Sequence, residues 1–66
     1  MHDHTFDESS KEMKARLRLI EGEIASGNDN IDLLKEAHQL LHSMARSGII
    51  SNYSASNHYK HLQSFF

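Results

Sequence analysis

The sequence predicts an all-α fold, in which an antiparallel helical hairpin and a short third helix complete a bundle as a homodimer. Apolar residues recur at spacings of three and four within three segments, which is typical of amphipathic helices. No proline interrupts these segments, and two glycine turns, "SGNDN" and "SGIISN", separate them. The 66-residue chain forms a single domain, residues 1–66, and has no cysteine to reinforce a small core. We therefore expect a second copy to add to the core.

The first predicted helix covers residues 6–26 and follows a flexible N-terminus of residues 1–5. Two capping-box patterns, each with a hydroxyl residue three positions before an acid, could begin it: Thr5 with Glu8 and Ser9 with Glu12. Its apolar stripe consists of Phe6, Met13, Leu17, Ile20 and Ile24. A helix with this stripe buries one face against another helix.

The second predicted helix covers residues 31–46, with Asn30 or Asp29 as its N-cap. Gly27 suits the left-handed residue that follows the first helix. Because the connection between the two helices is short, they must form an antiparallel hairpin. The second helix supplies its half of the core through Leu34, Ala37, Leu41 and Met44.

The third predicted helix covers residues 52–64 and carries Ala55, Tyr59, Leu62 and Phe66 at spacings of four, three and four. Phe65 and Phe66 end the chain, and two free aromatic rings would form an exposed apolar patch. We expect them to cover the hairpin of this chain or of a neighbouring chain.

The charge and hydropathy of the chain exclude several classes of protein. The formal net charge of −2 and the pI near 6.3 provide no basic field for a nucleic-acid backbone. No apolar run approaches the ~18 residues of a membrane span, and the acidic N-terminus is unlike a signal peptide. The sequence therefore predicts a cytoplasmic protein that does not enter a membrane.

Two histidine pairs lie at helical spacing, and they suggest either boundary residues or a metal site. His38 and His42 are four residues apart, and His58 and His61 are three apart. Imidazoles one turn apart on a helix can reach a single cation. The residue after His38 is Gln39, however, whereas the zinc-peptidase pattern has glutamate there. We predict no metal and no cofactor, and interpret His38 as a residue at the margin of a packed face, with His42 turned further towards solvent.

The segment "ASGNDNIDLLKEAHQLLHSMARSG", residues 25–48, resembles the core of histidine-containing phosphotransfer domains. The matching positions are Asp29, Leu34, Ala37, His38, Leu40, Ser43 and Gly48. This resemblance implies a phosphorelay module in which His38 accepts the phosphoryl group. The chain has Leu41 and His42 where that family usually has lysine and glycine.

The function that the sequence favours is non-enzymatic, namely a small regulatory or adaptor protein that binds another protein through helical surface. Ser43 lies off the face of both neighbouring histidines, and no glycine-rich phosphate loop is present, so no catalytic residue is predicted. The candidate contact residues are His38, His42, Tyr53, Tyr59 and Phe66. A helix-turn-helix regulator is a further alternative, with base or phosphate contacts from Ser54, Ser56, Asn57, His58 and Lys60.

Overall fold

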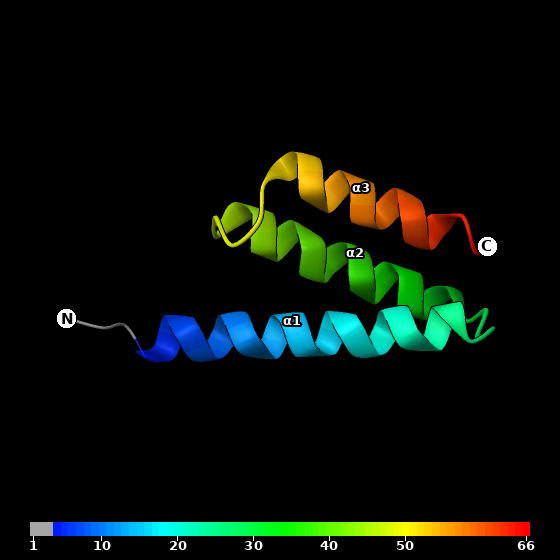
Figure 1. The fold of residues 1–66 in the computed structure, drawn as a ribbon, viewed down its shortest axis with the longest axis horizontal. Helices are drawn as coiled ribbons and strands as arrows, with labels where there is room; N and C mark the ends of the chain where they lie inside the picture. The colour runs from blue at the N-terminus through cyan, green and yellow to red at the C-terminus, as the bar shows by residue number, and fades with distance from the viewer. Residues whose placement is uncertain (1–3) are drawn as a thin grey trace.

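Three α-helices joined by short loops make up the computed structural model, which describes the backbone of residues 4–66 and the side chains of residues 10–66. The helices are α1, His4–Ala25; α2, Ile31–Arg46; and α3, Asn52–Gln63. Figure 1 shows α2 between the other two helices and antiparallel to both. The predicted all-α class, the hairpin and the third helix are therefore confirmed.

The start of α1 differs from the prediction. The helix begins at His4, so Thr5 and Ser9 lie within it and neither is its N-cap. Residues 4–12 contain neither proline nor glycine, and helical hydrogen bonds therefore continue back past both hydroxyl residues. Of the N-terminus predicted to be flexible, residues 1–3 lie outside the described residues, and the other two belong to α1.

Side chains cap the starts of the other two helices. The Oδ1 atom of Asn30 accepts a hydrogen bond from the Asp32 N–H at 3.0 Å, as expected for the N-cap of α2. The Ser51 Oγ accepts from the Ser54 N–H at 3.0 Å and caps α3. Gly27 and Gly48 follow the preceding helices with φ of 107° and 79°, a conformation that glycine adopts without strain. Local sequence thus sets both turns.

The core lies between α2 and its two neighbours. Seven of the nine stripe residues predicted on α1 and α2 are buried, and α3 adds one more side chain, Leu62. Met13 is half-buried against this core, and the side chain of Phe6 lies outside the described side chains. The full set is Leu17, Ile20, Ile24, Leu34, Ala37, Leu41, Met44 and Leu62. A single chain buries this set, so covering the hairpin does not by itself require a second copy. Phe65 and Phe66 each remain 46% exposed and cover the hairpin only partly.

None of the helices in the described residues is both long and apolar enough to cross a bilayer. α1, the longest, carries charged residues throughout its length. This agrees with the absence of a membrane span that the sequence predicts.

One ion pair joins the exposed edges of α1 and α2. The Arg16 Nε and Nη2 atoms donate to the two carboxylate oxygens of Glu36 at 2.5 and 2.9 Å. These hydrogen bonds, together with the charge of Arg16, hold the pKa of the Glu36 carboxyl below its ordinary value, although desolvation opposes this shift. The two-pronged geometry fixes the orientation of both side chains on the hairpin.

We predict that Glu36→Gln lowers the thermal midpoint at pH 7, and that this difference shrinks as the pH falls to 3. Since the pKa of Glu36 is lower in the folded chain, its stabilising effect is present above the unfolded pKa of about 4.3. The effect is lost as the pH falls through the folded pKa. Because both side chains are exposed, the change in midpoint at pH 7 should be small. Thermal melts of both proteins from pH 7 to pH 3 measure it.

The control for this titration is Asp29→Asn, which neutralises an exposed acid in the loop between α1 and α2. This variant should melt like the parent protein across the same pH range. A Glu36→Gln deficit that persists undiminished at pH 3 would contradict the assignment to the ion pair.

Candidate protein-binding site between α2 and α3

A hollow of about 250 Å³ lies where α2 and α3 run side by side. Its lining residues are His38, Leu41, His42, Ala45, Asn52, Ala55, Ser56 and Tyr59. Leu41 is 1% exposed and belongs to the core, so the hollow has an apolar floor. Three of the residues, Ala45, Ala55 and Ser56, have short side chains that leave space between the helices.

The two histidines reach this hollow because they lie one turn apart on the side of α2 that faces α3. Both side chains are exposed. The ring of His38 lies against the ring of Tyr59, with their centroids 4.5 Å apart and their planes at 34°. This contact fixes the imidazole beside the opening, while Tyr59 itself is half-buried.

The hollow offers hydrogen-bonding groups around an apolar floor. Imidazole nitrogens, the Asn52 amide, the Ser56 hydroxyl and the Tyr59 hydroxyl can all donate or accept. No acidic residue is among the residues that line it. Such a site can receive the polar or acidic side chain of a partner together with some apolar contact.

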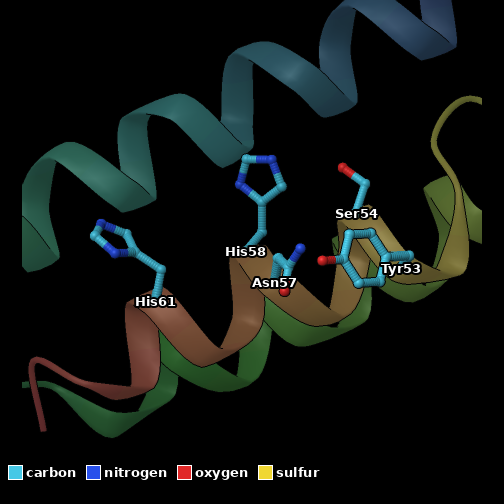
Figure 2. A pocket seen from close by; sticks show the side chains of 5 residues that line it. All are labelled: Tyr53, Ser54, Asn57, His58 and His61. Carbon is cyan, nitrogen blue, oxygen red and sulfur yellow. The ribbon is translucent and has the colours of Figure 1, made fainter.

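The other histidine pair occupies a different part of the molecule. The Nδ1 atom of His58 lies 3.1 Å from the Glu21 Oε2 atom on α1, and the His61 ring meets Phe65 edge to face. Figure 2 shows both imidazoles pointing toward α1, with Tyr53 and Asn57 beside them on α3. His58 thereby links α3 to α1, whereas His38 and His42 lie between α2 and α3.

The four histidines that the sequence offers as weak metal ligands lie in two separate places. Because the two pairs face different neighbouring helices, the four imidazoles do not meet at one point. Within residues 10–66, whose side chains the structure describes, no group of three or more histidine, cysteine or acidic side chains is placed to hold a metal ion. His2 and His4, which could add imidazole nitrogens, lie outside the described side chains.

The predicted contact residues separate into two groups. His38, His42 and Tyr59 meet in the hollow between α2 and α3. Tyr53 is 78% exposed and lines a second hollow on α3, together with His58 and His61, and Phe66 lies at the C-terminal end. Sequence reasoning did not connect Asn52 or Ala45 with the histidines. In the sequence, Asn52 and Ala45 stand out only as a polar and a small residue near a turn. Their position beside the histidines follows from the register of α3 on α2, which the sequence does not give.

Comparisons of the chain with protein-family models, with curated proteins and with solved structures found no match. The fold and the sites above define a small all-α protein of three helices, in which α1 packs on α2 and α2 on α3.

Proposed function

We propose that this protein is a small, non-enzymatic cytoplasmic regulator or adaptor that binds another protein through the hollow between α2 and α3. The observation that supports it is the convergence of His38, His42 and Tyr59 on one hollow with an apolar floor. Tyrosine is among the side chains that typically anchor protein interfaces, and the two imidazoles beside it add hydrogen-bonding groups. We further propose that the protein acts as a homodimer.

The mechanism is recognition of a partner surface. A partner helix lying along the α2–α3 seam would place one side chain in the hollow and its neighbours against the exposed rims of both helices. The Tyr59–His38 contact holds the rim in place before binding, so little conformational entropy is lost there. No covalent chemistry is involved.

The test is capture of partners from host lysate by the intact protein and by a His38→Ala/His42→Ala variant, followed by binding of each purified candidate. We expect the partner to bind the double variant about tenfold or more weakly, because truncated anchors at the centre of an interface have the largest effects. Isothermal titration calorimetry measures the dissociation constants.

The matched control is Tyr53→Ala, which removes an exposed aromatic ring from the other hollow on α3. This variant should retain the affinity of the intact protein. If the partner binds His38→Ala/His42→Ala as well as the intact chain, or is lost only with Tyr53→Ala, the α2–α3 hollow is not the binding site.

Phosphotransfer through His38 is the second candidate, and the exposure of that imidazole at the rim of the hollow favours it. Leu41, three residues further, is buried, so this position offers no cation to a phosphate on His38. Incubation with acetyl phosphate or a phosphorylated receiver domain tests this function. Acid-labile label on the intact chain and none on His38→Ala would establish it.

A further inference from the structure

Acidic and basic residues are divided unevenly along the chain. All nine aspartate and glutamate residues precede Ala37, and residues 37–66 contain none. The same second part contains Arg46, Lys60 and four of the six histidines. Because α3 and most of α2 come from this part, the surface that they share has no carboxylate side chain to repel an anionic partner.

The basic residues of α2 form a row along the rim of the hollow. Lys35, His38, His42 and Arg46 follow one another at spacings of three, four and four, and all four are exposed. His38 and His42 line the hollow, which fixes the side of α2 on which this row lies. Two imidazoles therefore line the hollow, and the row continues along α2 with Lys35 before them and Arg46 after them.

The first turns of α1 are acidic. The sequence places Asp7, Glu8 and Glu12 there, with Lys11 as the only cation up to residue 12. Figure 1 shows that the start of α1 extends past the loop between α2 and α3. α1 packs on a different side of α2 from the row around the hollow, so the two cannot meet within one chain.

We infer that the acidic start of α1 in one copy docks against the basic row of α2 in a second copy, beside the hollow between α2 and α3. The two copies exchange this contact reciprocally, so each supplies one acidic start and one basic row, and a closed dimer results. The inference rests on the proposed function, since it names the surface through which the proposed homodimer forms. Opposite charges make this association sensitive to salt.

Charge reversal on one side at a time tests the exchange. The first variant, Glu8→Lys/Glu12→Lys, has a basic start, and the second, Lys35→Glu/Arg46→Glu, has an acidic row. In a homodimer of either variant, like charges face each other. In a heterodimer of the two variants, the basic start faces the acidic row and the unchanged acidic start faces the unchanged basic row, so opposite charges meet in both contacts. We expect a salt-sensitive wild-type dimer, about tenfold or more weaker self-association of each variant, and recovery in the equimolar mixture. Sedimentation equilibrium measures the association, and circular dichroism verifies that each variant is folded.

A matched control excludes attraction by net charge alone. Glu23→Lys/Asp29→Lys has the same net charge as the first variant but keeps the acidic start. The control should still associate with itself, because both of its contact surfaces are unchanged, but it should not draw the acidic-row variant into dimers. A monomeric wild type at low salt, self-association that survives in both charge-reversed variants, or incorporation of the acidic-row variant into dimers by the control would each overturn the inference.

The partner experiment has a separate readout. Loss of partner binding in His38→Ala/His42→Ala tests the proposed function, whereas recovery of dimers in the mixture tests the exchange. A chain that dimerises as described but binds no partner through the hollow would leave the inference standing and reject the proposed function.

Discussion

Leu41→Ala is expected to lower the free energy of unfolding by about 2–5 kcal/mol, because it leaves a cavity under both packed interfaces of α2. Leu41 is 1% exposed and also forms the floor of the α2–α3 hollow. A 66-residue chain has a total stability of only about 3–10 kcal/mol. The substitution should therefore remove a large part of the stability of the protein. Urea denaturation followed by circular dichroism measures the change.

The matched control is Leu19→Ala, the same change at a position on α1 that is 64% exposed. It should change the stability by no more than about 0.5 kcal/mol, since little apolar surface is buried there. Equal losses from the two substitutions would show that α2 does not hold the core as described.

Leu62→Ala is expected to lower the free energy of unfolding by a similar amount, about 2–5 kcal/mol, but the helices should unfold in a different order. Leu62 is the one α3 residue in the buried core, and the side chains of Ala55 and Tyr59 are only half-buried. Without it, α3 should separate from the hairpin before the rest unfolds, because local segments with few buried contacts open first. Amide hydrogen exchange should be faster in residues 52–63 than in α2.

Phe66→Ala is the matched control on the same helix end, since its ring is 46% exposed. We expect it to leave the exchange rates of α3 amides close to those of the parent protein. If Leu62→Ala instead accelerates exchange equally in all three helices, α3 unfolds together with the hairpin and is not a separate unit.

The attachment of α3 matters for the proposed function because the hollow exists only while α3 lies on α2. Tyr59, Ala55 and Ser56 approach His38 and His42 from that helix. The His58–Glu21 contact and Leu62 hold α3 from its other side. A variant with detached α3 should therefore lose partner binding, even with every residue of α2 intact.

The sequence by itself determined the helices and their buried faces. Residues 31–46 form a helix with the predicted bounds, capped by Asn30, and the stripe through Leu34 and Leu41 is buried. These features depend on helical periodicity, N-cap chemistry and glycine turns, which act over a few residues. Only the beginning of α1 was misplaced, because two equally good capping patterns lie inside a segment that continues as helix.

Only the tertiary structure decided where α3 lies and which histidines meet. Periodicity shows which face of α3 is apolar, but not the side of the hairpin that it covers or its register on α2. These depend on how distant side chains pack, such as Leu62 in the core and Tyr59 against His38. The same packing places His58 beside Glu21 and separates the two histidine pairs. The hollow between α2 and α3 is therefore a property of the assembled helices. One wall comes from α2 and the other from α3, and each wall residue on α2 is at least seven positions from any wall residue on α3.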